Sequence, residues 1–502
     1  MSRQSASAPS SLSLKTKALY GMGEVSNSIR AFAFGLFLLF YYTSVLGLPG
    51  TLVGLATAVS LIWDALIDPF IGHISDKARF RFGRRHPFML VGAICIGIGF
   101  FLVFSPPAGL STGALFAWLI GTNFLLRTTH SLFMVPYHAF GAELSQDYEE
   151  RTSITGIRAG FGLFGTLVAA GSSFVVFFPN TTPGVDPKFN VSSYASMGLA
   201  FGVAMTVFGL ITTIGTWSHG AGAQVAQRPS ATAPMGFFSG IALSLRNPSF
   251  LILTISTSIF FLASVVNATL AVHYLNYYAR ITDSGSLSLF QLSFYVGALA
   301  GVAFWLRMAS RLAKHHVYIG ATLIVAFLMA AAYGLVGEGH PFGTGNLIPL
   351  VIGNTVAGFF GATLWVVPAS MIADVTDQDD LTTGRRREGA YFGIHSFFLQ
   401  EAAGVALLIT GILVDRFAGL IPGQVEQSPQ TINRLAMLFS LLPAILLCGA
   451  ALLMLGYGLT RLRVQAIQSE LARRRKHTMR IADSDVETVA EESGVEASPS
   501  TL

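Results

Sequence analysis

The sequence predicts an all-α integral membrane protein with twelve transmembrane helices in two six-helix bundles. Its 502 residues are 52% hydrophobic and only 11% charged, whereas soluble domains carry about 25% charged residues. The hydrophobic residues form twelve runs of roughly 20 residues or more, the length that a bilayer core requires. These runs are continuous and show no two-residue alternation, so we expect helices rather than the strands of a barrel.

The twelve predicted spans follow one another along the chain. They cover approximately residues 18–46, 51–74, 87–105, 114–140, 153–177, 194–217, 249–278, 287–309, 316–335, 347–371, 388–415 and 431–458. The expected organisation is a cytoplasmic N-terminus (1–17), a first six-helix bundle (18–217), a cytoplasmic linker (218–248), a second six-helix bundle (249–458) and a cytoplasmic tail (459–502). The linker is rich in small residues and contains proline, which is typical of a connection between domains.

The positions of the Lys and Arg residues predict the orientation. If the N-terminus is cytoplasmic, the inside segments hold 23 of the 31 basic residues and the outside loops hold three. The remaining five lie within the spans or at their edges. This asymmetry follows the positive-inside rule and predicts a multi-pass protein of the cell membrane with both termini in the cytoplasm. Because membrane topology explains the basic charge, we expect no nucleic-acid partner.

The two halves of the sequence resemble each other. Segments 136–158 and 368–393 each contain a proline, an acidic residue, an acidic cluster and a basic residue before the next predicted helix. The basic loop 75–86 has a shorter counterpart at 307–316. Parallel repeats of six spans are the plan of the major facilitator transporters.

Two acidic residues lie inside the second predicted span. Asp64 and Asp68 are four residues apart and therefore share one face of a helix. Ionisable groups inside a bilayer are costly and usually functional, and two carboxylates with nearby hydroxyls suit Na⁺ or a proton. Arg127, in the fourth span, could instead pair with these acids. A working cation site, a permanent ion pair and a pair that opens on protonation all remain open.

Three stretches carry a resemblance to a known family. Residues 64–88, 135–152 and 371–389 resemble characteristic segments of the glycoside–pentoside–hexuronide:cation symporter family, to which the melibiose carrier belongs. The similarity covers all twelve spans. It implies a major facilitator fold and cation-coupled transport of a small solute. It also implies a cation site, with Na⁺ possible at Asp64 and Asp68 and a hydroxyl ligand from Ser131.

The resemblance also indicates where a substrate would bind. Arg158 and Trp365 match substrate-site positions of the family, and His138 stands where the melibiose carrier has tryptophan. Other positions depart from that carrier: Asn27 replaces lysine, Ser28 and Met134 replace aspartates, and Gln400 replaces lysine. The acids that bind galactosides are therefore absent, so we do not expect a melibiose-type carrier.

Three arginines within the spans suggest the charge of the substrate. Arg30, Arg127 and Arg158 can each bind a carboxylate, phosphate or sulfonate through two hydrogen bonds. Together with the missing acids, they favour an anionic solute. The alternative is that each arginine pairs inside the protein or, for Arg30, extends toward the membrane interface. The predicted substrate-binding residues are Asn27, Ser28, Arg30, Arg127, His138, Arg158, Trp365 and Gln400.

Charged residues at the predicted cytoplasmic ends of the helices are candidates for gating. We expect them to form ion pairs between the halves that break and re-form during alternating access; solvated loop charge is the alternative. The predicted gating residues are Asp76, Arg84, Arg85, Glu143, Asp147, Arg151, Asp374, Asp377 and Arg386.

The sequence thus predicts a secondary active transporter that couples Na⁺ or H⁺ to an organic solute, a glycoside or related compound that is anionic. Two alternatives stay open: transport of anionic amphiphiles such as lysophospholipids, and an uncoupled uniporter or exchanger in which Arg127 neutralises Asp64 and Asp68. We expect no enzymatic activity and no cofactor beyond the coupling ion. The expected partners are the small-molecule solute and the lipid bilayer, and the protein is expected to function as a monomer.

Overall fold

The computed structural model describes residues 12–78, 80, 83–145, 147–180, 186–222, 246–384 and 387–474, and every regular element in these ranges is a helix. The first half (residues 12–222) contains α1 (Leu14–Gly21), α2 (Gly23–Ala33), η1 (Phe34–Leu38), η2 (Tyr41–Val45), α3 (Gly50–Lys77), α4 (His86–Val103), α5 (Thr112–Glu143), α6 (Tyr148–Phe177), η3 (Pro187–Phe189), α7 (Val191–Gly215) and α8 (Trp217–Gly222). The second half (residues 246–474) contains α10 (Pro248–His273), η4 (Tyr274–Tyr278), α11 (Ser284–Arg311), α12 (Lys314–Leu335), α13 (Leu347–Gly361), α14 (Thr363–Thr383), α15 (Glu388–Leu413), η5 (Val414–Ala418) and α16 (Pro429–Met454), followed by a helix over 461–474.

Within the described ranges, ten helices are long and apolar enough to cross a membrane. Two further segments have the length of a span: α5, and the continuous helical stretch 14–45 that α1, α2, η1 and η2 form together. The first of these contains Arg127, His130 and His138, and the second is divided into short helices. The predicted all-helical, multi-span architecture is confirmed.

Polar caps fix where many of these helices begin. A side-chain oxygen of the residue before the helix accepts a backbone N–H that would otherwise lack a partner. Such caps start α1, α5, α6, α7, α10, α11 and α16, through Ser13, Ser111, Asp147, Asn190, Asn247, Asp283 and Ser428. The caps are short polar residues next to long apolar runs, so sequence alone places these helix starts well.

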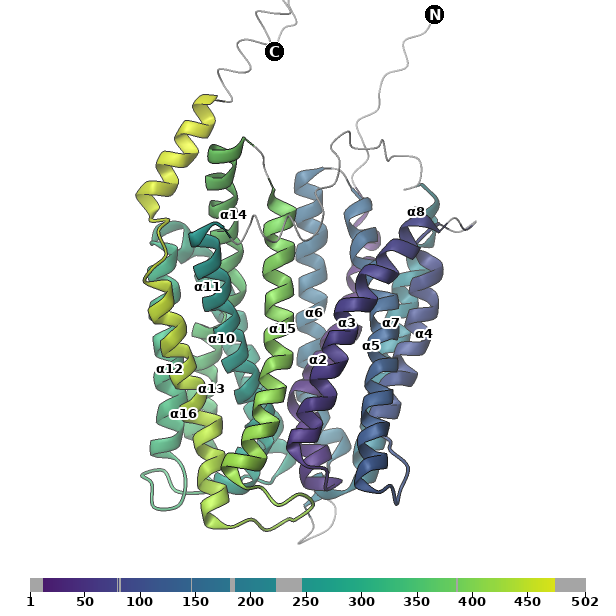
Figure 1. Ribbon diagram of the computed structural model, residues 1–502, viewed down its shortest axis with the longest axis vertical. Coiled ribbons are helices and arrows are strands. Elements are labelled where there is room, and N and C mark those ends of the chain that lie inside the picture. The colour runs from purple at the N-terminus through teal and green to yellow at the C-terminus, as the bar shows by residue number, and fades with distance from the viewer. Residues whose placement is uncertain are drawn as a thin grey trace, which may run out of the picture.

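The two halves lie side by side and meet mainly along three helix pairs, with a smaller contact between α3 and η5. In Figure 1 α3, α4, α5 and α7 lie to the right, and α10, α12, α13 and α16 to the left. Contacts between the halves join α3 to α15, α6 to α11 and η1 to α10. We call the end of the bundle that holds α8 and helix 461–474 the terminal face, at the top of Figure 1, and the opposite end the distal face.

The π-helical segments reveal the internal repeat at the distal face. In the first half, the N–H groups of Leu46 and Leu48 donate to the carbonyls of Tyr41 and Tyr42. In the second half, the N–H groups of Ala279 and Ile281 donate to the carbonyls of Tyr274 and Leu275 and close the same wide turns at η4. The first helix of each half therefore ends in the same way, as a parallel repeat predicts.

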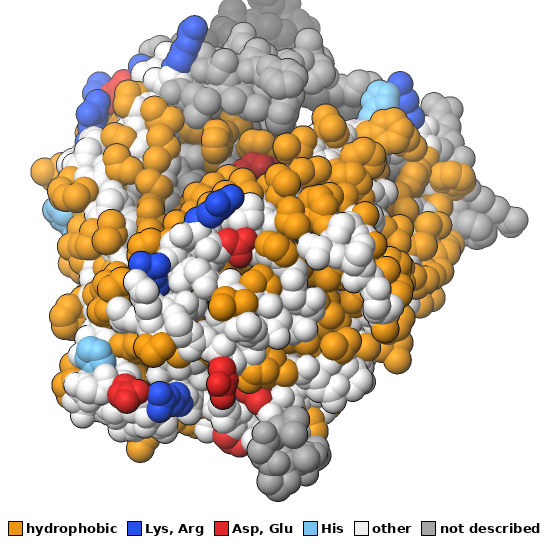
Figure 2. All heavy atoms as spheres, turned by 60° about the horizontal axis from the view of Figure 1, so that its bottom comes forward, with side chains coloured by type: hydrophobic (Ala, Val, Ile, Leu, Met, Phe, Trp, Pro, Cys, Tyr) orange, Lys and Arg blue, Asp and Glu red, His pale blue; other side chains and the backbone are white. Residues whose placement is uncertain are grey.

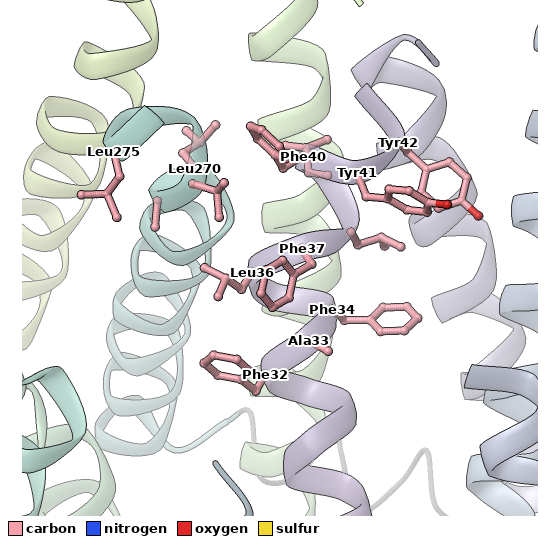
Figure 3. Packing of buried hydrophobic residues seen from close by; sticks show 14 of the residues in the cluster. Phe32, Ala33, Phe34, Leu36, Phe37, Phe40, Tyr41, Tyr42, Leu270 and Leu275 are labelled. Carbon is pink, nitrogen blue, oxygen red and sulfur yellow. The ribbon is translucent and has the colours of Figure 1, made fainter. Parts of the chain in front are cut away.

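Aromatic packing closes the bundle near the distal face. Phe40 contacts His273 and Tyr277 of the other half, with ring centroids 4.9 and 6.5 Å apart. Figure 3 shows Leu36 and Phe40 on the side of α10, where Leu270 lies, while Phe34 and Tyr42 point to the other side of the first helix. All of these hydrophobic side chains are buried. The first helix of the chain thus joins the two halves in one apolar core.

The outer surface suits a bilayer. Large apolar side chains are exposed on the sides of the helices, among them Val203, Ile214, Phe327, Ile445 and Leu452. Figure 2, which looks toward the distal face, shows a broad hydrophobic surface with only a few separate charged side chains. An exposed apolar surface of this extent needs a non-aqueous neighbour, which a membrane supplies.

Candidate functional site

An ion pair between α3 and α5, one of the alternatives that the sequence left open, is present. A guanidinium nitrogen of Arg127 lies against Asp64 Oδ2, with exposed side-chain fractions of 14% and 22%. Ser131, one turn further along α5, donates a long hydrogen bond of 3.5 Å to Asp64 Oδ1. The structure therefore brings together three residues that sequence analysis placed in one site, and it pairs the acid with the arginine.

Asp68 lies one turn along α3 from Asp64 and has a different hydrogen-bonding environment. Its Oδ1 atom is buried and has no hydrogen-bond partner among the described residues. A buried carboxylate oxygen without a partner carries a large desolvation cost. Asp68 therefore forms no ion pair within 4 Å among the described residues, although Arg30 lies within electrostatic range.

A tryptophan holds α3 and α5 in register beside this pair. The Trp63 indole N–H donates to the Thr128 hydroxyl at 2.8 Å, and its ring stacks on Phe124 with centroids 5.2 Å apart. Trp63 precedes Asp64 and Thr128 follows Arg127. This contact fixes the distance between the backbones that carry the acid and the base.

A second set of polar groups runs along one face of α2. Glu24, Asn27 and Arg30 are three residues apart and therefore lie on neighbouring turns. Asn27 Nδ2 donates to Glu24 Oε1 at 2.9 Å, while Arg30 donates to Asn27 Oδ1 at 3.3 Å. His130 Nε2 of α5 lies 3.1 Å from the same Asn27 oxygen. Asn27 thus connects α2 to α5.

Arg30 has a hydrogen-bond donor that is not used by the described residues. Its Nε atom is buried without a hydrogen-bond partner, and none of the ion pairs formed among the described residues includes it. The carboxylates of Asp64 and Asp68 and the guanidinium of Arg127 lie within electrostatic range. Arg30 is therefore a cation next to the α3–α5 pair with hydrogen-bonding capacity to spare.

Toward the terminal face, Glu24 meets two predicted substrate residues. His138 Nε2 and Arg158 Nε each lie 3.7 Å from Glu24 Oε2. They border a cavity of about 210 Å³, whose lining residues are Tyr20, His138, Gly141, Ala142, Arg151, Ile154, Thr155 and Arg158. Cationic and aromatic side chains beside a hollow of this kind can hold an anionic group.

The remaining predicted substrate residues are placed differently. Ser28 donates to the Glu24 carbonyl of its own helix at 2.9 Å, and Met134, which stands where the melibiose carrier has an aspartate, is buried. Trp365 and Gln400 belong to α14 and α15 in the second half, and both are exposed. No hydrogen bond among the described residues joins these two to the residues of α2, α3 and α5.

At the terminal face of the first half, Glu143 forms ion pairs with two arginines of the basic loop. Arg84 and Arg85 donate to Glu143 Oε1 at 2.5 and 2.7 Å, and Arg85 also reaches Asp76 at 2.9 Å. Asp147 caps α6 by accepting the Glu150 N–H, so its role here is local. Arg151 donates to the carbonyls of Ser145 and Ala142.

The second half repeats this arrangement with other residues. Asp374 pairs with Lys314 at the start of α12 (2.6 Å), as Glu143 pairs with the arginines at the start of α4. Asp377 accepts from Gln468 of the helix 461–474 at 3.3 Å. Arg387 forms two hydrogen bonds with Asp379, which raise the pKa of Arg387. The predicted gating residue Arg386 lies outside the described residues.

These terminal-face ion pairs join described residues of the same half. Our prediction that such charges exchange partners between halves therefore concerns another arrangement of the helices, and it stays a prediction. Sequence analysis missed Lys314 and Asp379 as partners, although both stand beside the acidic and basic clusters that it identified. It also did not assign Glu24 to the site. The signal was present: Glu24, Asn27 and Arg30 have helical spacing.

Polar contacts between the halves lie at the distal face. Asn180 donates to Asp283 (2.9 Å) and Lys188 to the Thr282 carbonyl (3.1 Å). Asp415 accepts the first N–H groups of α3, from Gly50 (2.8 Å) and the next residue. Burial lowers the pKa of the Lys188 ammonium, while a backbone hydrogen bond from Ser286 lowers the pKa of the Asp283 carboxyl.

Comparison with known proteins places this geometry in context. A family model described as "MFS/sugar transport protein" matches residues 19–461. The sodium-dependent lysophosphatidylcholine symporter 1-B of Danio rerio is 25% identical, over 94% of this chain and 92% of that protein. The putative glycoside/cation symporter YagG of Escherichia coli is 25% identical, over 92% of this chain and 96% of that protein. A bacterial homologue of the lysosomal transporter Spinster shares the fold, with a TM-score of 0.62 and 13% identity over 91% of this chain and 97% of that one.

Proposed function

The chain belongs to the MFS/sugar transport protein family, and on that premise we propose that it is a cation-coupled symporter of an anionic organic solute. Relatives named as symporters support secondary transport and not enzymatic catalysis. It is a multi-pass membrane protein that carries a small molecule. The coupling ion and the charge of the solute form the proposal.

The observation that carries the proposal is the charge balance around α2, α3 and α5. Asp64 is paired with Arg127, and Glu24 lies near His138 and Arg158, which leaves the buried Asp68 oxygen and the Arg30 Nε atom without partners. A cation at Asp68 would compensate the first of these groups. An anionic solute at Arg30 would compensate the second. Binding of both together is what symport of Na⁺ or H⁺ with an anion requires.

The position of the contacts between halves supports alternating access. Hydrogen bonds between described residues of the two halves lie at the distal face, while the terminal-face ion pairs stay within each half. We propose that the terminal face is cytoplasmic, as the basic residues predict, and that this conformation opens inward. Rocking of the halves about the central site would then expose it to the outside.

Two other functions each have an observation in their favour. The Arg127–Asp64 pair favours an uncoupled uniporter or exchanger, because the arginine occupies the place of a cation. The similarity to a lysophosphatidylcholine symporter favours an amphiphile with a phosphate group as the solute. Both functions are compatible with this fold and with arginines that bind an anion. Transport measurements are therefore needed to distinguish them.

A proteoliposome uptake screen tests the proposal. Sulfated, carboxylated and neutral glycosides and a lysophospholipid are offered with an inward Na⁺ gradient, an inward H⁺ gradient or no gradient. We expect gradient-driven accumulation of an anionic solute, lost in Asp64→Asn and Asp68→Asn and retained in Glu426→Gln, which removes an exposed loop carboxylate. Equal uptake without any gradient would establish the uniporter instead, and full stimulation in both aspartate variants would refute the cation site.

A further inference from the structure

The helices α3 and α15 approach each other closely through glycines. A Cβ atom added to Gly50 would lie 2.8 Å from the Gly411 carbonyl oxygen, and one added to Gly404 would lie 1.3 Å from Leu61 Cδ1. Along this contact, residue numbers rise on α3 as they fall on α15, so the two helices run antiparallel. Among these glycine contacts, the pairing of Leu61 with Gly404 lies nearest the terminal face.

The next turn beyond that contact contains one acid on each helix. Asp64 follows Leu61 by three residues, and Glu401 precedes Gly404 by three residues. Residues three apart share a helix face, so both acids lie on the facing sides at the same level. Glu401 is partly exposed and lies within electrostatic range of both Arg127 and Asp64.

Glu401 has no described counter-charge. No hydrogen bond or ion pair among the described residues includes its carboxylate, whereas Asp64 is engaged with Arg127. Glu401 belongs to the second half, and Arg127 and Asp64 belong to the first. A relative rotation of the halves therefore changes the distance from Arg127 to Glu401, while Arg127 and Asp64 move together.

We propose that Glu401 is a second, conformation-dependent partner for Arg127, and that the transfer of Arg127 from Asp64 to Glu401 frees Asp64 for the coupling cation. The inference rests on the proposed function and deepens it. Closure of the terminal face narrows the gap between α3 and α15 beyond Leu61 and Gly404, which brings Glu401 toward Arg127. Reopening draws Glu401 away, and Arg127 returns to Asp64.

This exchange gives the ion pair a role in coupling. A partly buried carboxylate that loses its arginine needs another positive charge, so Asp64 binds the cation while the terminal face is closed. When the face opens, Arg127 competes for Asp64 and displaces the cation. Arg127 then acts as a positioning residue for the cation site, and Glu401 acts through Arg127.

Binding of ²²Na⁺ to the purified full-length protein in nanodiscs tests the exchange. In Glu401→Gln, Arg127 has no alternative partner and stays on Asp64, so we expect an apparent affinity about tenfold weaker, the factor for an interaction of ordinary strength. Glu426→Gln, the matched control, keeps the affinity of the unmodified protein. In an Arg127→Ala background, Glu401→Gln has no further effect because the competitor is gone. An equal loss in both backgrounds, or no loss in either, overturns the proposal.

A distance measurement gives a second readout that also serves if the coupling ion is a proton. Added side chains at Gly156 of α6 and Gly389 of α15 meet no atom within 4 Å, so cysteines there accept spin labels once Cys95 and Cys448 are replaced. We expect Glu401→Gln to reduce the population with a short interlabel distance, and Arg127→Ala to remove that effect. Unchanged distances together with unchanged ion binding refute the exchange. Unimpaired ²²Na⁺ binding in both Asp64→Asn and Asp68→Asn refutes the proposed cation site itself, whatever Glu401 does.

Discussion

The Arg127–Asp64 pair makes a quantitative prediction about stability. Breaking a fully buried ion pair by removing one partner costs about 3–5 kcal/mol, because the other charge stays buried and uncompensated. Here the side chains are 14% and 22% exposed, and Ser131 still donates to Asp64. We therefore expect Arg127→Ala to lower the free energy of unfolding by about 2–4 kcal/mol, somewhat less than for a fully buried pair.

The double variant separates the ion pair from other effects of the substitutions. Asp64→Asn alone leaves Arg127 unpaired, with a cost similar to that of Arg127→Ala, whereas the double variant leaves no buried charge from the pair. The sum of the single costs should exceed the cost of the double variant by about 0.5–3 kcal/mol, the range for directly interacting residues.

Denaturant unfolding in mild detergent, followed by tryptophan fluorescence, measures all four members of this cycle. Trp63 adjoins Asp64 and donates to Thr128, so its emission reports on the site directly. The same unfolding experiment can be repeated at increasing sodium concentration. A ligand at 100 times its dissociation constant stabilises the native state by about 2.7 kcal/mol. Arg127→Ala should reach that stabilisation at a lower sodium concentration than the unmodified protein. Additive single costs with no change in the sodium effect would refute the competition between Arg127 and a cation.

Three further predictions concern other contacts. Gly404→Leu places a side chain where Leu61 lies, so we expect it to separate α3 from α15 and abolish uptake while membrane insertion, measured by surface labelling, persists; normal uptake would refute the close packing. Glu143→Gln leaves Arg84 and Arg85 without their shared carboxylate, and it should lower the unfolding midpoint in thermal denaturation by more than Glu426→Gln does; equal midpoints would mean that these ion pairs contribute nothing to stability. Asn180→Ala removes a donor to Asp283 at the distal face, so the population with a short interlabel distance between positions 156 and 389 should rise; an unchanged distribution would show that this contact does not hold the face closed.

The candidate site was only partly predictable from the sequence. Asp64, Asp68 and Arg127 stand out because charges are rare inside apolar runs and because helical spacing places the two acids on one face. Glu24 and Asn27 were harder to interpret, because their importance comes from the helices that α2 faces. Their contacts to Arg158 and His130 span more than 100 residues of sequence.

The sequence by itself determined the membrane class and the approximate spans, because the length of an apolar run is a local property. It also determined the repeat, since related segments recur at related places in both halves. The tertiary structure decided which charge meets which. The partner of Asp64 depends on how α3 and α5 are rotated about their axes, and Glu401 lies near the site because Gly404 lets α15 approach Leu61. Such pairings depend on packing between distant segments, which no local pattern records.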